Sequence, residues 1–175
     1  MHRFIGWLGA GVLAGLIMLG SVIQADDKDK EKPKAQKLTP DKIPQKVMAA
    51  IKGRFPGADI TAAEREVEDG NVVYDIELTH QGRKYEMDIK EDGTIIEIEK
   101  EIKLKDLSEA VAKAVKAKYP KATIVEIMEV NKVKGKQETP DHYEIVIETA
   151  DKKKMELEVS LDGKSIKAGS EGEKK

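Results

Sequence analysis

The sequence predicts an α+β fold built as a tandem duplication, in which a helix is followed by an antiparallel meander of three or four strands and packs on one sheet face. Three observations predict it. Apolar residues recur every four positions in two segments, as in a helix with one buried side. Alternating apolar and polar residues follow each segment, and Gln-Gly or Asp-Gly pairs separate the alternating stretches. The matched residues occur in the same order in both halves of the chain.

The first 25 residues have the features of a secretory signal peptide. His2 and Arg3 form a short positive start, residues 4–23 are apolar and uncharged, and Ala25 is a small residue that suits cleavage. An uncleaved membrane anchor is the alternative, because the apolar stretch is long enough to span a bilayer as a helix. Both alternatives predict an exported chain, periplasmic or extracellular, that touches a membrane only if the segment stays uncleaved.

The rest of the chain divides into two repeats between polar ends. Residues 26–38 alternate in charge and carry few apolar side chains, so we expect a disordered charged tether there. Residues 169–175 are expected to form a disordered tail. The first repeat is expected at 39–104 and the second at 105–168.

Each repeat opens with a predicted helix. Both helices should end before a proline, Pro56 in the first and Pro120 in the second, since a following proline disfavours helical backbone. We expect Asp41 to cap the first helix and Asp106 the second. The apolar stripes are Ile43, Val47, Ile51 and Phe55, then Leu107, Val111, Val115 and Tyr119.

Period-two alternation predicts the strands. Extra residues near 132–141, with Gly135 and Pro140, predict a longer loop in the second repeat. The residues expected to face the core are Val72, Tyr74, Ile76 and Leu78; Tyr85, Met87 and Ile89; Ile96 and Ile98; Tyr143, Ile145 and Ile147; and Met155, Leu157 and Val159.

The connector between the repeats is short, at residues 100–105. Each repeat alone has a marginal core, because a domain of about 60 residues buries only part of its apolar surface. We therefore expect the two sheets to lie edge to edge or to share an apolar seam, and to unfold as one cooperative unit. Ile102 and Leu104, the apolar residues of the connector, are expected to pack at that seam.

These elements resemble the PepSY-like family. The resemblance rests on Ile43-Pro44-Gln45-Lys46-Val47, on Phe55-Pro56-Gly57-Ala58, on Tyr74, Tyr85 and Asp92-Gly93, and on the matching residues of the second half. It implies an exported bacterial domain whose tandem pairs share the fold of the β-lactamase inhibitory protein. It also implies an inhibitory or chaperone-like role, and it carries over no catalytic residue, because the signature residues are core and turn positions.

Composition excludes several functions. The 175-residue chain has 31 Lys and Arg against 33 Asp and Glu, so it lacks the basic surplus of nucleic-acid-binding proteins. It contains no cysteine, which excludes disulfides, thiol nucleophiles and thiolate zinc sites. We expect no cofactor, no metal and no catalytic residue. A small hydrolytic or metal-assisted enzyme that uses His80 or His142 with nearby carboxylates is the alternative function, although neither histidine lies in a metal-binding or hydrolase motif.

The candidate binding site is the sheet face opposite the helices. By alternation, ten acids point to this face, and we expect it to be an outer, solvent-facing surface that engages a basic protein surface or cations. A solvated face that only keeps the domain soluble is the alternative. The resulting hypothesis is an exported, non-enzymatic binding module, with an inhibitor or modulator of a secreted or envelope protein as a special case. The ten residues are Asp75, Glu77, Glu86, Asp88, Glu97, Glu99, Glu144, Glu148, Glu156 and Glu158.

Overall fold

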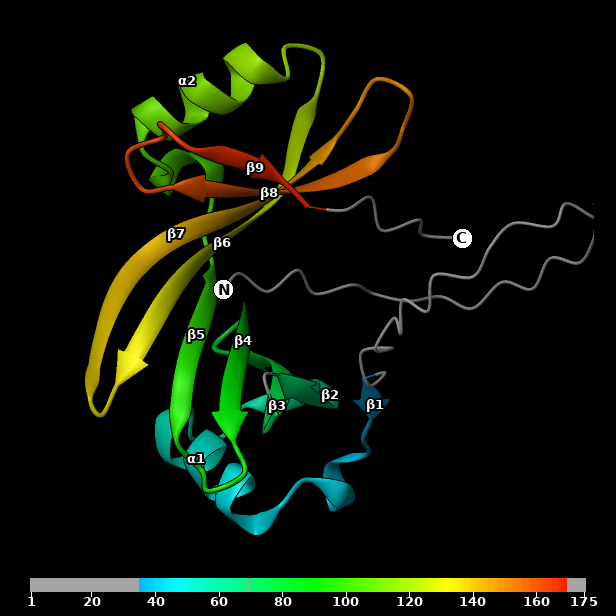
Figure 1. Cartoon of the computed structure of the whole chain (residues 1–175), viewed down its shortest axis with the longest axis vertical. Coiled ribbons are helices and arrows are strands. Elements are labelled where there is room, and N and C mark those ends of the chain that lie inside the picture. The colour runs from blue at the N-terminus through cyan, green and yellow to red at the C-terminus, as the bar shows by residue number, and fades with distance from the viewer. Residues whose placement is uncertain (1–34, 69, 170–175) are drawn as a thin grey trace, which may run out of the picture.

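The computed structural model describes residues 35–68 and 70–169 (Figure 1). Within them the chain forms two α-helices and one antiparallel sheet of nine strands, which confirms the α+β class. The predicted signal peptide, most of the tether and most of the tail lie outside the described residues. The helices are α1 (Gln45–Arg54) and α2 (Glu109–Lys118). The strands are β1 (Gln36–Lys37), β2 (Asp59–Glu68), β3 (Asn71–His80), β4 (Arg83–Lys90), β5 (Ile95–Glu101), β6 (Thr123–Lys134), β7 (Gln137–Glu148), β8 (Lys154–Ser160) and β9 (Ile166–Ala168).

The nine strands follow one another in the sheet in chain order, from β1 to β9. The two halves join where β5 pairs with β6, with Glu97 opposite Lys132 and Glu99 opposite Val130. The expected edge-to-edge arrangement is therefore correct, although it makes one continuous sheet in place of two. That the halves arose by duplication stays a prediction.

Each helix covers its own part of the sheet, and α1 and α2 lie at opposite ends of the molecule (Figure 1). The buried stripe of α1 packs on β3, β4 and β5 in a first core cluster that includes Val47, Ile76 and Met87. The stripe of α2 packs on β6, β7 and β8 in a second cluster that includes Val111, Ile145 and Leu157. The stripes and most strand positions predicted to face the core do so.

The C-terminal ends of the helices agree with the sequence-based predictions better than their N-terminal ends do. Both helices stop two residues before a proline, as expected. The predicted caps Asp41 and Asp106 are wrong, because each lies in a separate 3-10 turn ahead of its helix. Pro44 occupies the cap position of α1, and the Ser108 hydroxyl accepts a hydrogen bond from the backbone N–H of Val111 in α2.

Local irregularities account for two further corrections. The pairing of β4 with β5 shifts register between Asp88 and Ile89, so that Ile95, and not Ile96 as expected, packs against the first core cluster. The expected charged tether at 26–38 does not extend to residue 38, because Gln36 and Lys37 form β1 and pair with β2.

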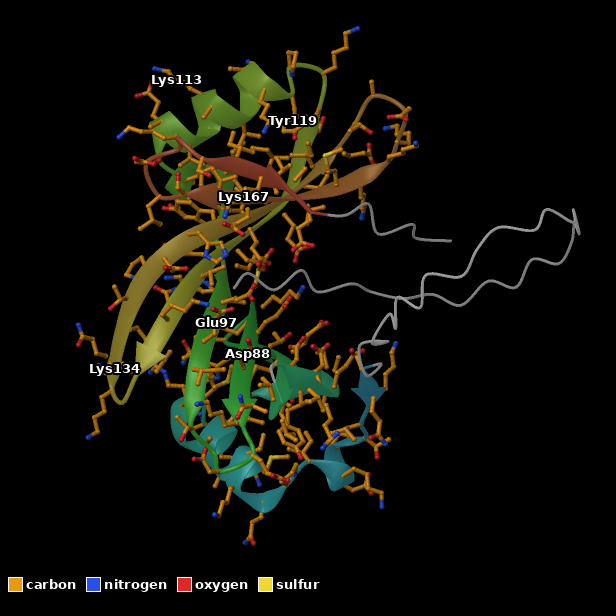
Figure 2. The ribbon with its side chains drawn as sticks, in the orientation of Figure 1. Asp88, Glu97, Lys113, Tyr119, Lys134 and Lys167 are labelled. Atoms are coloured by element: carbon orange, nitrogen blue, oxygen red, sulfur yellow. The ribbon has the colours of Figure 1, made fainter. Side chains whose placement is uncertain are left out.

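The hairpin of β6 and β7 is longer than the neighbouring hairpins of its half. The extra residues predicted to form a loop lengthen both strands instead, and Gly135 and Lys136 make a tight turn. The end of this hairpin, marked by Lys134 in Figure 2, reaches the first half of the molecule. There Val133 packs against the first core cluster, and Arg54 of α1 forms an ion pair with Glu138.

The connector residues supply a first prediction. Ile102 packs against the second core cluster and its N–H donates to the Ile127 carbonyl at 2.9 Å, whereas Leu104 is 57% exposed, so the expectation that both pack at the seam is wrong for Leu104. Replacing Ile102 by Asp should lower the free energy of unfolding by about 2 kcal/mol. Leu104→Asp is the matched control and should change it by less than about 0.5 kcal/mol. Urea denaturation measures both, and equal losses would contradict this packing.

A second prediction concerns Gly93, in the turn between β4 and β5. Its φ is +87°, and a Cβ there would lie 2.8 Å from the carbonyl oxygen of Lys46 in α1. Gly93→Ala should therefore lower the free energy of unfolding by roughly 2–4 kcal/mol, from backbone strain and a forced shift of the helix. Gly82→Ala is the control, because its φ is +75° and its Cβ would meet no atom within 4 Å. Gly82→Ala introduces the backbone strain without the contact with α1. Similar thermal denaturation midpoints for the two variants would therefore rule out an effect of that contact.

Candidate functional site

The predicted acids share the sheet face opposite the helices. Cross-strand pairing sets like charges directly beside one another in two rows across the first half of the sheet. In one row Asp75 lies opposite Asp88, which lies opposite Glu97; Figure 2 shows Asp88 and Glu97 on neighbouring strands near the middle of the molecule. In the other row Glu77, Glu86 and Glu99 follow one another in the same way. Like charges in adjacent pairs are destabilising unless something neutralises them.

The second half continues this surface. Glu144 of β7 lies opposite Glu158 of β8, and Glu156 lies opposite Val146. Glu126 of β6, which sequence reasoning missed, joins them. A register shift between Ile124 and Glu126 sets the direction of its side chain, and alternation read from the sequence cannot reveal such a shift. The ten predicted acids and Glu126 are called the acidic face below.

The acidic face is not the solvent-facing surface that the sequence predicted. Asp75, Asp88, Glu97 and Glu99 are buried, while Glu77, Glu86, Glu144, Glu156 and Glu158 are half-buried. Glu148 lies apart at the end of β7, where Lys152 of the following turn pairs with it at 2.8 Å. The interpretation of the face as merely solvated is therefore wrong for its centre.

Curvature of the sheet explains this burial. Lys84 of β4 donates a hydrogen bond to Glu126 of β6 at 3.0 Å, across the intervening strand. The charge of Glu86 in β4 acts on Glu156 in β8. In a flat sheet these two strands would lie about 19 Å apart, at a spacing of about 4.8 Å per strand. The sheet therefore curves toward its acidic face, and the carboxylates of the two halves approach one another.

Basic side chains neutralise part of this charge. Lys84 contacts Glu86 at 2.8 Å as well as Glu126, Lys167 pairs with Glu158 at 2.9 Å, and Lys132 forms an ion pair with Glu97. His142 lies at the margin, with Nδ1 2.9 Å from Asp141 and Nε2 3.6 Å from Glu144. These contacts outweigh the burial of the imidazole, which by itself lowers the pKa of His142, and leave it raised.

The carboxyl groups whose negative charge is not balanced by a basic side chain have raised pKa values. Burial, followed by the charges of Glu144, Glu86, Glu97 and Asp75, raises the pKa of Glu99 well above its ordinary range. Burial also raises the pKa of Glu86, against the opposing effect of Lys84. Burial and a hydrogen bond with Glu144 raise the pKa of Glu156 to about 8. A pKa of about 8 favours the protonated form of Glu156 near neutral pH, and the shifts of Glu86 and Glu99 act in the same direction.

Glu99 is the most constrained of these groups. Its residue is only 5% exposed, and its Oε2 atom accepts no hydrogen bond from the residues that the structure describes. Val130 of β6 lies directly opposite Glu99 and is fully buried, and its apolar side chain has no donor group. A buried carboxylate without a donor is costly to retain in the folded chain.

The two histidines lie in separate settings in the two halves of the sheet. His80 lies 5.5 Å from Phe55, measured between ring centroids, in an aromatic contact at the end of β3. Ser160 is opposite His142 in the sheet, but its hydroxyl donates to Asp162 at 2.8 Å and accepts from the N–H of Ser165, both in the following turn. In the described ranges no three His, Asp or Glu side chains gather in an arrangement that could hold a metal ion.

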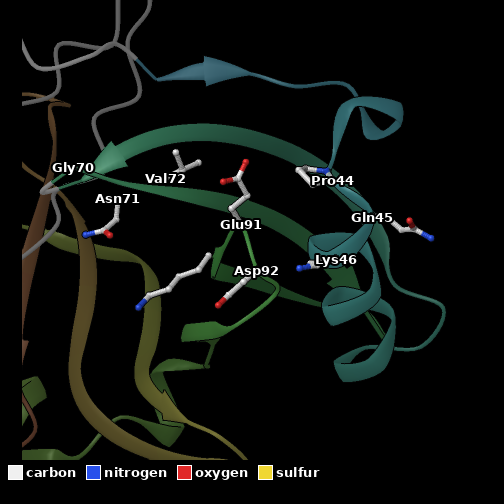
Figure 3. A pocket seen from close by; sticks show the side chains of 9 residues that line it. Pro44, Gln45, Lys46, Gly70, Asn71, Val72, Glu91 and Asp92 are labelled. Atoms are coloured by element: carbon white, nitrogen blue, oxygen red, sulfur yellow. The ribbon is translucent and has the colours of Figure 1, made fainter.

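An open pocket of about 710 Å³ lies between the start of α1 and the two turns that flank β3 and β4 (Figure 3). Lys46 and Lys90 line it together with Glu91 and Asp92, so its charges offset one another. The Asp92 carboxylate is already engaged, because it accepts the N–H of Thr94 at 2.9 Å. The pocket therefore presents no convergent set of polar groups to a ligand.

Two family models match the chain. The model described as "Peptidase propeptide and YPEB domain" matches residues 44–99. The model described as "Putative beta-lactamase-inhibitor-like, PepSY-like" matches residues 72–167, more than half of the chain. The matched ranges together contain both helices and strands β2 to β8. No curated protein matches the sequence.

Solved structures of bacterial proteins share the fold. A DUF2874 family protein from Bacteroides uniformis aligns with a TM-score of 0.57 at 17% identity, covering 75% of this chain and 92% of that one. A BLIP-like protein from Bacteroides fragilis aligns with a TM-score of 0.50 at 20% identity, covering 75% and 89%. A protein from Bacteroides eggerthii described as "putative periplasmic" aligns with a TM-score of 0.54 at 15% identity, covering 71% and 88%. Within residues 35–68 and 70–169, no helix has the length and hydropathy needed to cross a membrane.

Proposed function

Because the chain belongs to the PepSY-like, beta-lactamase-inhibitor-like family, we propose that it is an exported, non-enzymatic binding module whose acidic face engages a basic surface of another protein. An inhibitor or modulator of a secreted or envelope protein is the form of this function that the family and the BLIP-like neighbour favour. The periplasmic neighbour and the N-terminal sequence support an exported location. The two halves, at residues 39–104 and 105–168, are proposed to be tandem repeats that build one binding face.

The observation that carries this proposal is the concentration of buried and half-buried acids around Glu99. A solvated face would leave the carboxylates exposed, where repulsion is weak and screened by salt. This sheet instead curves around them and retains a carboxylate oxygen without a donor. A face that stores electrostatic repulsion gains stability when a positively charged partner binds, since the partner supplies the missing opposite charge.

A protein partner is favoured over a metal ion. The carboxylates follow rows along several strands, so a partner with several separate positive groups can contact more of them than a single ion can. Lysine and arginine side chains are long enough to reach separate carboxylates of such a surface, and arginine can contact two oxygens at once.

Affinity capture with matched variants tests the proposed function. The wild-type chain, immobilised on a resin, should retain a basic protein from an envelope extract, and retention should weaken as NaCl rises from about 0.05 to 0.5 M. A variant with Glu77→Gln, Glu144→Gln and Glu158→Gln should lose that protein. The control has the same change of net charge at exposed positions elsewhere, through Glu91→Gln, Glu109→Gln and Asp151→Asn, and should keep it. Equal retention by the two variants, or retention indifferent to salt, would contradict the acidic face as the binding surface.

A further inference from the structure

The centre of the acidic face has an unusual composition for a protein–protein contact surface. Five carboxyl groups from four strands meet there: Asp75 of β3, Glu86 of β4, Glu97 and Glu99 of β5, and Glu144 of β7. They are called the central cluster below. From β6 the neighbour is the apolar side chain of Val130.

The basic groups around the central cluster leave Glu99 without compensation. Lys84 is held between Glu86 and Glu126, and Lys132 is held by Glu97. His142 is held at the margin by Asp141 and Glu144. Among the described residues, the Oε2 atom of Glu99 is buried and accepts no hydrogen bond.

Two arrangements can neutralise such a cluster. The carboxyl groups can retain protons, which removes charge but leaves oxygens with poor hydrogen bonding. A positively charged group can enter instead, and it supplies both the opposite charge and several N–H donors. The second arrangement is stronger, because charge-assisted hydrogen bonds are roughly twice as strong as neutral ones.

We infer that the central cluster is a socket for one guanidinium or ammonium group of the bound partner, and that this group enters in exchange for a proton held by the cluster. The inference rests on the proposed function and names the chemistry of its central contact. The proton passes from a carboxyl group of the cluster to solvent, and the entering N–H groups donate to the carboxylate that remains. The complex is therefore favoured as pH rises and released in acid.

The most accessible carboxyl groups of the central cluster come from both halves of the sheet. The side chains of Glu86 and Glu144, which face each other across the curved sheet, are each 13% exposed and form the rim of the socket. Glu99 is the direct cross-strand neighbour of Glu86 and is more deeply buried, at 5% exposed. A guanidinium group suits this arrangement, because its planar set of five donors can serve carboxylates on two sides at once.

Calorimetry with a defined peptide tests the inference. The purified chain is titrated with an acetylated and amidated tetra-arginine peptide, at several pH values and in two buffers of different ionisation enthalpy. The difference in heat between the buffers counts the protons released on binding. We expect release of about one proton per peptide near pH 7, and an affinity that rises up to about tenfold per pH unit between pH 6 and 8.

Two variants locate the proton. Glu99→Gln keeps the size of the side chain and removes the carboxylate, so it should bind the peptide at least about tenfold more weakly and without proton release. Glu101→Gln is the matched control, because it lies on the same face and strand but is exposed, and it should behave like the wild type. Circular dichroism verifies that both variants are folded.

Other outcomes overturn the inference in distinguishable ways. If the peptide binds without releasing protons, or if Glu99→Gln releases the same number as the wild type, the socket is not at Glu99, although the acidic face can still be the binding surface. If CaCl₂ alone releases the same proton with comparable affinity, the cluster is a divalent-cation site. If the wild-type chain binds no tetra-arginine, the socket does not exist, and affinity capture still decides the proposed function separately.

Discussion

Replacing Val130 by aspartate is expected to lower the free energy of unfolding at pH 8 by about 4 kcal/mol or more. Val130 is fully buried on the acidic face, where its strand neighbours are Glu99 on one side and His142 on the other. The substitution removes a buried apolar side chain. It also adds a second carboxylate beside Glu99, whose own carboxyl group is already buried among other acids. The neighbouring Lys84 and Lys132 are already paired with other acids.

Val125→Asp is the matched control, since it is the same substitution in the same strand at a side chain that is 47% exposed. It should cost less than about 1 kcal/mol. Urea denaturation of the two variants at pH 8 gives the comparison. Similar losses for both would mean that repulsion and burial at the centre of the acidic face contribute little to stability.

Glu99→Gln is expected to raise stability at pH 8 by roughly 1–3 kcal/mol and to have little effect near pH 5. A carboxyl group whose pKa is higher in the folded chain than in the unfolded chain binds its proton more tightly when folded. The stability that such a group contributes is fully present below its pKa in the unfolded chain, near 4.5. It is lost as pH rises through the higher pKa in the folded chain. Glu99, Glu86 and Glu156 all shift in this direction, Glu156 to about 8, and the raised pKa of His142 acts in the same sense.

The wild-type chain should therefore lose stability between about pH 5 and 8. The lowered pKa values of Asp41, Asp92 and Asp151 do not oppose this loss, because they act only below about pH 4. Urea denaturation across this pH range measures it for the wild type, Glu99→Gln and the exposed control Glu101→Gln. A wild-type stability that rises with pH, or a Glu99→Gln curve parallel to that of the wild type, would contradict a protonated cluster.

Much of the fold follows from local sequence signals. The helical stripes ending before Pro56 and Pro120 depend only on side-chain period and backbone sterics, and they are reproduced in α1 and α2. The helix starts are less predictable, because acids at Asp41 and Asp106 resemble caps although separate 3-10 turns intervene. Ser108, the residue that does cap α2, lies only two positions after Asp106, and both are residue types that favour caps, so the sequence alone does not decide between them.

The sequence predicts which acids share the candidate face, but it does not predict how deeply they are buried. Alternation alone assigns Asp75, Glu86 and Glu99 to one face, because successive strand residues point to opposite sides. Their burial depends on how strongly the sheet curves and on the pairing of β5 with β6, which bring the acids of both halves together. Curvature is a property of the whole sheet, so no local stretch of sequence reveals it. The register shift before Glu126 likewise leaves no signal in the alternation of apolar and polar residues.

The pairing of every strand with its neighbour in the chain also bears on how this protein reaches its folded state. Most pairings are hairpins that close a short segment, and only β1 with β2 and β5 with β6 enclose a helix. Little chain entropy is lost before such local contacts form, so the chain is expected to fold quickly for a β-rich protein. The end of the β6–β7 hairpin makes more distant contacts, since Val133 and Glu138 contact residues of the first half that lie far back in the sequence. Its docking should be a late event, which makes that contact a place to look for residues whose substitution speeds unfolding without slowing folding.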